Sequence, residues 1–103
     1  MYAVIRRYNI APGSAASIAQ KVNTELLPSL GQMPGFGAYY AIDPADGTMV
    51  SVSIFESREE ADASTKAATD WVRQNLGSMI KTAPVIISGT IVAHAGEGAA
   101  RHA

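Results

Sequence analysis

Two runs of alternating apolar and polar residues, on either side of a polar segment, predict a β-hairpin in the middle of the chain. Residues 36–42 and 49–55 are rich in aromatic and β-branched side chains, which favour strands. The connecting residues 43–47 include Asp43, Pro44 and Gly47, which favour a tight turn. The chain is therefore expected to reverse direction within this stretch.

Two further strands are predicted near the ends of the chain. Residues 2–8 alternate around a β-branched centre, which places Val4, Arg6 and Tyr8 on one face of the first strand. Residues 85–93 follow Pro84 and form an apolar, β-branched run that predicts the last strand. With the hairpin, these segments give four strands.

Apolar residues at helical spacing predict one helix before the hairpin and one after it. The first begins near Ser14, a helix-capping residue, and should kink or end at Pro28, which lacks a backbone N–H. The second begins at Ser57, which forms a capping box with Glu60, and should stop at Gly77. The resulting order is strand, helix, two strands, helix, strand.

This order predicts a ferredoxin-like α+β fold, in which a four-stranded antiparallel sheet carries both helices on one face. The opposite face then needs a cover, and we expect a homodimer that packs two sheets together. By alternation, that face is expected to carry Ser51, Ser53, Phe55, Ser88, Thr90 and Val92. The length of 103 residues predicts one domain, residues 1–94, and residues 95–103 are expected to form a flexible tail.

Composition and charge change this picture only by exclusion. The chain has 8 basic and 9 acidic residues and a net charge of −1, which argues against nucleic acid and anionic membranes as partners. It has no cysteine, so disulfides and thiolate nucleophiles or metal sites are excluded. No apolar run reaches the roughly 18 residues of a membrane-spanning helix, and we expect a soluble, cytoplasmic protein.

Several short motifs resemble those of a known family. They are Pro12-Gly13-Ser14 before the first helix, Pro34-Gly35-Phe36 before the second strand and Phe55-Glu56-Ser57 before the second helix. With the alternating first strand, they resemble the antibiotic-biosynthesis-monooxygenase-like domains of the dimeric α/β-barrel superfamily over about residues 2–93. The resemblance implies this fold and an activity such as cofactor-independent oxidation of aromatic polyketides or haem degradation, although many members have no assigned reaction.

Haem degradation is disfavoured by the residues at the positions that the resemblance implies for it. The haem-degrading members place an asparagine, a tryptophan and a histidine where this chain has Arg6, Ser64 and Gln74. The two histidines, His94 and His102, belong to the last strand and the tail and have no second ligand at metal spacing. No cofactor and no metal are therefore expected.

Arg6 and Tyr40 are the first candidates for a ligand pocket, because their strand positions allow both side chains to point toward the helices. Arg6 could hold an enolate, phenolate or carboxylate through paired hydrogen bonds, and Tyr40 could donate to a carbonyl. The alternatives are an ion pair between Arg6 and an acid such as Glu56, and core packing for Tyr40. Tyr39 has the opposite parity and is expected at the dimer interface.

Trp71 on the second helix is expected either to pack in the core or to line a pocket for an aromatic ligand. No residue is assigned a catalytic role. Two classes of function stay open: a cofactor-independent monooxygenase acting on an aromatic or polyketide-like small molecule, and a non-catalytic small-molecule-binding or stress-response module. A cavity between sheet and helices that contains a charged or phenolic side chain would favour the enzyme.

Overall fold

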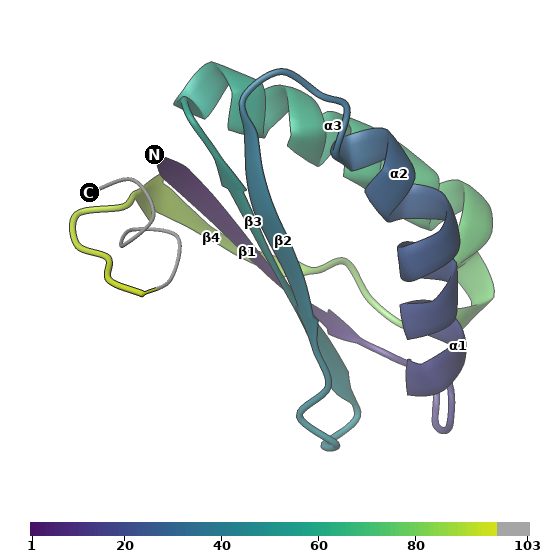
Figure 1. The fold of residues 1–103 in the computed structure, drawn as a ribbon. Coiled ribbons are helices and arrows are strands. Elements are labelled where there is room, and N and C mark those ends of the chain that lie inside the picture. The colour runs from purple at the N-terminus through teal and green to yellow at the C-terminus, as the bar shows by residue number, and fades with distance from the viewer. Residues whose placement is uncertain (97–103) are drawn as a thin grey trace.

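The computed structural model describes residues 1–96 and contains the strands and helices that the sequence predicts. In chain order the elements are β1 (Tyr2–Asn9), α1 (Ala15–Lys21), the π-helical turn η1 (Val22–Leu26), α2 (Leu27–Leu30), β2 (Phe36–Ile42), β3 (Thr48–Phe55), α3 (Arg58–Asn75), the 3-10 turn η2 (Gly77–Met79) and β4 (Val85–Thr90). The strands lie in the order β2-β3-β1-β4, neighbouring strands are antiparallel, and the helices cover one face of the sheet (Figure 1). The ferredoxin-like fold is therefore confirmed.

The C-terminal part of the chain differs from the prediction in extent. Strand β4 ends at Thr90, three residues before the predicted end at residue 93. The predicted tail, residues 95–103, lies almost entirely outside the described residues. Within residues 1–96, no helix combines the length and apolarity needed to cross a membrane.

Residues 15–30 form one helical segment that continues past Pro28 instead of ending there. Proline cannot donate the backbone hydrogen bond that an α-helix would require at this position. The chain widens into the π-helical turn η1 just before it, where the Leu27 N–H bonds the Val22 carbonyl, and α2 then carries the helix to Leu30. Ser14 does not cap the helix through its side chain, because its hydroxyl donates to the Ala11 carbonyl at 2.6 Å.

Helix α3 begins with the predicted Ser57 cap. The Ser57 Oγ accepts a hydrogen bond from the Glu60 N–H at 3.3 Å and donates to Glu60 Oε1 at 3.0 Å. The buried face of this helix consists of the small residues Ala61, Ser64 and Ala68. These side chains let α3 lie close to β1 and β3, with which it makes contact.

The residues of β3 and β4 that were predicted to face away from the helices lie on the face toward the helices. Ser51, Ser53 and Phe55 face the helices and are 4%, 1% and 0% exposed. Ser53 pairs with Val4, which lies on the inward face of β1, so Ser53 faces inward as well. Ser51 and Phe55 lie two residues from Ser53 on the same strand and therefore face the same way. Ser88 and Thr90 pair with Val4 and Tyr2 on that same inward side. The outward face instead carries a larger apolar set, Ala38, Tyr40, Ile42, Val50, Val52, Ile54, Ile5, Val85 and Ile87.

A β-bulge at Gly37 sets the orientation of β2. The pairing register shifts between Phe36 and Ala38, so the alternation of side chains slips by one residue. Phe36 packs inward against Phe55, with ring centroids 5.7 Å apart, and Tyr39 also points inward. Tyr40 points outward and is 58% exposed. The predicted orientations of Tyr39 and Tyr40 were therefore wrong.

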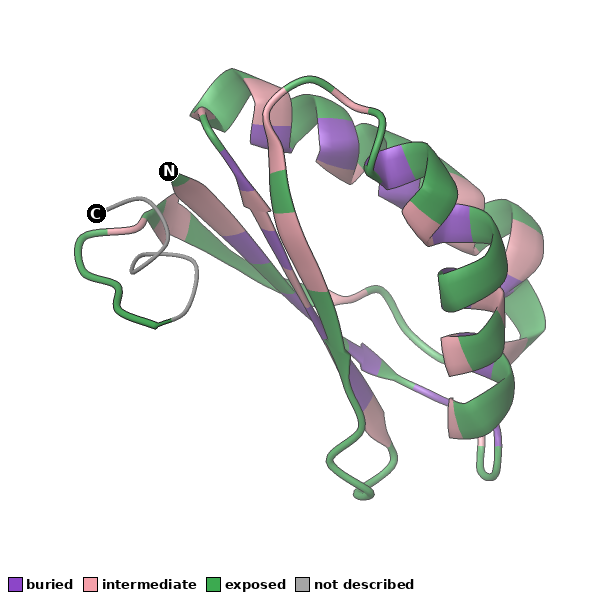
Figure 2. Ribbon diagram, in the orientation of Figure 1, coloured by how far each residue is buried: buried purple, intermediate pink, exposed green. Residues whose placement is uncertain are grey.

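The interior contains two apolar clusters. Figure 2 shows buried positions both on the sheet and on the helices that cover it. The larger is Tyr8, Ile10, Ile18, Val22, Leu26, Leu30, Met49 and Leu76, and the smaller is Val4, Phe55 and Ala61. On β1, Arg6 lies between Val4 of one cluster and Tyr8 of the other. A polar zone therefore crosses the middle of the space between sheet and helices.

Gly37→Ala should destabilise the protein. A Cβ at this position would lie 3.0 Å from the backbone oxygen of Ile54. This oxygen cannot move away without disrupting the backbone hydrogen bonds between the strands. The expected loss is about 1–3 kcal/mol in the free energy of unfolding, measured by chemical denaturation. Gly89→Ala is the matched control, because a Cβ on Gly89 meets no atom within 4 Å. Equal stabilities of the two variants would contradict this account of the bulge.

Candidate functional site

Arg6 is buried without an anionic partner. Its residue exposure is 1%, and its guanidinium donates to the Ser53 Oγ at 3.3 Å and to the Thr65 Oγ1 at 2.8 Å. The expected alternative, an ion pair with Glu56, is not formed, since the only two ion pairs within residues 1–96 are Arg58–Asp62 and Arg73–Asp70. The sheet and α3 therefore hold a cation through neutral hydroxyl groups alone.

Two polar atoms in this zone lack hydrogen-bond partners among the described residues. They are the Arg6 Nε and the Oγ of Ser51, the residue that pairs with Arg6 across β1 and β3. Buried polar groups in proteins are normally partnered, because an unpartnered group loses about 1–3 kcal/mol of hydration. The unpartnered Nε–H of Arg6 and the unpartnered hydroxyl of Ser51 lie at the same point of the sheet, which indicates a place where a ligand atom or a water can bind.

A closed cavity lies at this point. Its volume is about 20 Å³, and its polar lining comes from Arg6, Tyr8, Tyr39 and Ser51. The apolar lining is Ile18, Val22, Leu26, Ala41, Met49, Ala68, Val72, Leu76 and Ile80. This volume holds about one water molecule, so a larger ligand requires the lining side chains to move.

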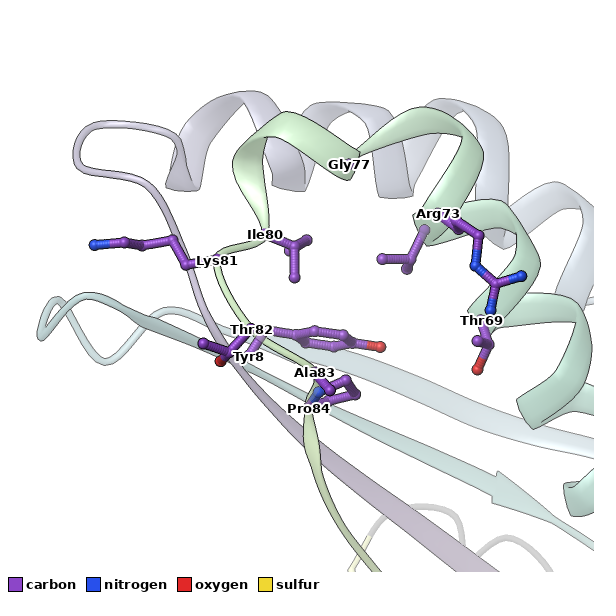
Figure 3. A pocket seen from close by; sticks show the side chains of 10 residues that line it. Tyr8, Thr69, Arg73, Gly77, Ile80, Lys81, Thr82, Ala83 and Pro84 are labelled. Atoms are coloured by element: carbon purple, nitrogen blue, oxygen red, sulfur yellow. The ribbon is translucent and has the colours of Figure 1, made fainter.

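A larger open groove adjoins the cavity on the side of α3 and β4 (Figure 3). Its volume is about 390 Å³, and it is lined by Tyr8, Thr69, Val72, Arg73, Gly77, Ile80, Lys81, Thr82, Ala83 and Pro84. Tyr8, Val72 and Ile80 line both the groove and the cavity. These three side chains therefore form the partition between the solvent-accessible groove and Arg6.

The two phenols beside Arg6 are hydrogen-bond donors rather than bases. Burial raises the pKa of Tyr8 above its ordinary value of 10.0, although the nearby Arg6 charge opposes the shift. Burial also raises the pKa of Tyr39, against the effects of the Ser51 hydroxyl and of Arg6. No hydrogen bond of standard geometry joins Tyr39 to the Ser51 Oγ, which stays unpartnered. No Asp, Glu or His lines the cavity, so it offers a cation and neutral donors, a set suited to an anion.

The predicted site residues are not brought together. Arg6 lines the cavity, but Tyr40 lies on the outward face of the sheet. Trp71 lines a separate groove of about 230 Å³ with residues such as Leu30 and Met33, away from Arg6. Tyr8 lies two residues after Arg6 on β1 and therefore faces the same side of the sheet. It could have been identified as a cavity residue from the alternation of the first strand alone.

The residues present do not fit a haem group or a metal. Neither the cavity beside Arg6 nor the adjoining groove is lined by a histidine, the residue that most often ligates a haem iron. Within residues 1–96, no group of three or more His, Asp or Glu side chains is placed to hold a metal ion.

The sequence and the fold are both similar to those of known proteins. The model of the antibiotic biosynthesis monooxygenase family matches residues 1–69 of the chain, and the chain belongs to this family. No curated protein sequence matches it.

Solved structures share the fold at low sequence identity. A protein of unknown function from Nitrosomonas europaea is 20% identical, with a TM-score of 0.76 and 93% of each chain covered. A monooxygenase from the ActVA-Orf6 gene of Streptomyces coelicolor, in complex with the ligand nanaomycin D, is 15% identical, with a TM-score of 0.76 and 93% of this chain and 91% of that chain covered. A MhuD variant with two manganese protoporphyrin IX molecules bound per active site is 16% identical, with a TM-score of 0.74 and 94% and 100% covered.

The buried phenols should make the protein less stable in alkali. Because the folded state keeps the Tyr39 proton to a higher pH than the unfolded state, the free energy of unfolding should fall as pH rises past about 10. Tyr39→Phe should flatten this fall, measured by denaturant titrations between about pH 8 and 11. Tyr2→Phe removes a phenol from the beginning of β1, outside the cavity, and controls for the loss of a hydroxyl. A parental slope in Tyr39→Phe would contradict the assignment.

Proposed function

We propose that the protein is a cofactor-independent monooxygenase of an aromatic or polyketide-like small molecule, which it binds through a phenolate or enolate oxygen at Arg6. The observation that carries this proposal is a guanidinium that is 1% exposed, has no acidic partner and borders a cavity. A buried charge of this kind is several kcal/mol less stable than in water unless an opposite charge joins it. Membership of the monooxygenase family, and a relative of the same fold in complex with nanaomycin D, support the choice of reaction and ligand.

The reaction needs no external reductant when the substrate carries an acidic CH₂ group next to the phenol or enol. Loss of a proton gives a carbanion whose charge is delocalised onto the oxygen held by Arg6. The carbanion combines with O₂ to give a peroxide on that carbon, and loss of water leaves a carbonyl. One oxygen atom enters the product and the other enters water, so oxidation of CH₂ to C=O supplies all four electrons.

The residues of the cavity have separate roles in this reaction. Arg6 stabilises the anion and so lowers the pKa of the bound substrate, while Tyr39 donates a hydrogen bond to its oxygen. Because no carboxylate or imidazole lines the cavity, the substrate loses its proton to water in the solvent-accessible groove, and the rate should rise with pH until the bound substrate is fully ionised.

The closed cavity requires an opening step. The groove of about 390 Å³ is within the usual range for small-molecule sites and can hold the aromatic body of the ligand. The ligand oxygen reaches Arg6 once Val72 and Ile80 of the partition move aside. This partition also keeps water away from Arg6, which strengthens its attraction for an anion.

Arg6→Leu tests the proposal directly. Because no acid is left unpaired by the change, the melting temperature should stay the same or rise. Affinity for an anionic aromatic ligand should fall about tenfold or more, since hydrogen bonds to charged groups contribute about 1.5–3 kcal/mol. Binding is measured by thermal shift and calorimetry with nanaomycin D and a panel of hydroxylated anthrones.

Lys66→Leu is the control, because it also removes one cation but lines none of the cavities described above. It should bind the panel with parental affinity. Oxygen uptake with each bound anthrone then separates the two classes of function. Tight binding without Arg6-dependent oxygen uptake would leave a non-catalytic binding module, and parental binding by Arg6→Leu would remove Arg6 from the site.

We also propose that the protein forms a homodimer through the outward face of the sheet. Ile5, Tyr40, Ile42, Val85 and Ile87 on this face are between 37% and 64% exposed. An apolar surface of this extent is uncommon on a monomer and favours association. A symmetric dimer would cover it with a second copy of the same surface.

Ile87→Glu should convert the dimer to a monomer, because it would place a charge between two apolar sheets. Ile86→Glu is the matched control, since Ile86 is the next residue of β4, is 49% exposed and pairs with Arg6 on the inward side. Light scattering at micromolar concentration measures the mass of each variant. A parent protein that is already monomeric, or an equal effect of both changes, would contradict this interface.

A further inference from the structure

The groove outside the Arg6 cavity carries positive charge and no carboxylate. Its lining includes Arg73 and Lys81 but no Asp or Glu. The Lys81 ammonium group points away from Tyr8, and Lys81 also lines a neighbouring groove that contains Asp43 (Figure 3). Arg73 is therefore the cation available at the mouth of the Arg6 groove.

Arg73 is accompanied by two hydroxyl groups. Thr69 lies one helical turn before it on α3, so the two side chains share one face of the helix. In Figure 3 the phenol oxygen of Tyr8 points along the groove toward the side on which Thr69 and Arg73 lie. A guanidinium with two neutral donors is suited to a single carboxylate, whose two oxygens accept several hydrogen bonds.

The existing partner of Arg73 holds it only weakly. Its Nη1 lies 3.9 Å from the Asp70 carboxylate, and the two side chains are 74% and 52% exposed. Such surface pairs contribute about 0–1 kcal/mol, so a ligand carboxylate can replace Asp70 without a large loss. Asp70 does not line the groove, so its side chain does not occupy the space beside Arg73 there.

We propose that Arg73, Thr69 and Tyr8 form a specificity site for a carboxylate on the substrate, at the mouth of the groove. This inference rests on the proposed function, in which Arg6 takes the phenolate or enolate at the inner end. Tyr8 lines both spaces, so one ligand can meet both sites. The preferred substrates are then hydroxylated aromatic compounds that also carry a carboxylic acid.

The test compares a hydroxyanthrone carboxylic acid with its methyl ester by calorimetry. The parent should bind the acid about three- to fivefold more tightly, the ratio expected for a partly exposed ion pair, and the preference should shrink in high salt. Arg73→Gln should remove the preference. Lys66→Gln carries the same change of net charge on the same helix outside the groove and should keep the preference.

Arg6→Leu separates failure of this inference from failure of the proposed function. Equal affinity of the parent for acid and ester, with both lost in Arg6→Leu, would overturn the carboxylate site and leave the proposed function standing. A preference that survives in Arg73→Gln would overturn the site as well. If the parent binds neither compound, the proposed function fails and the carboxylate site fails with it.

Discussion

The buried guanidinium of Arg6 is held between β1, β3 and α3 by neutral hydroxyls, and its accommodation shapes the interior around it. Ser53 and Thr65 accept hydrogen bonds from the guanidinium but carry no negative charge. They therefore offset only part of the several kcal/mol of hydration free energy that Arg6 loses on burial. An apolar side chain at this position would join the two apolar clusters into one core. Since buried charges are often replaceable by apolar residues without loss of stability, the cation has no structural advantage here. The lack of a structural advantage favours a role for Arg6 in binding a ligand.

The bulge at Gly37 connects the candidate site to the proposed interface. Without the extra residue, Tyr39 would point outward and Tyr40 would point into the cavity. With it, Tyr39 joins Arg6 and Ser51 on the inward face, while Tyr40 joins the apolar outward surface. One backbone irregularity thus supplies a phenol to the cavity and an aromatic side chain to the opposite face.

The fold could be predicted because it depends on patterns that are local in sequence, namely the alternation in the strands and the Ser57 cap. The orientation of Arg6 could also be predicted, since β1 has no bulge. Tyr40 was misplaced because a bulge depends on a close approach between strands, here of Gly37 to Ile54, that no local pattern reveals. Thr65 could not have been foreseen as a partner of Arg6, because the contact depends on how α3 crosses the sheet.

The proposed reaction would explain why no catalytic motif is visible in the sequence. A site without a base leaves proton loss to the substrate and its solvent, and a substrate that supplies all four electrons needs no cofactor-binding segment. What the protein must supply is a desolvated cation and neutral donors, which ordinary strand positions provide. Because a low-dielectric surrounding strengthens the attraction between Arg6 and an anion, the apolar side chains that close the cavity would take part in activating the substrate together with Arg6.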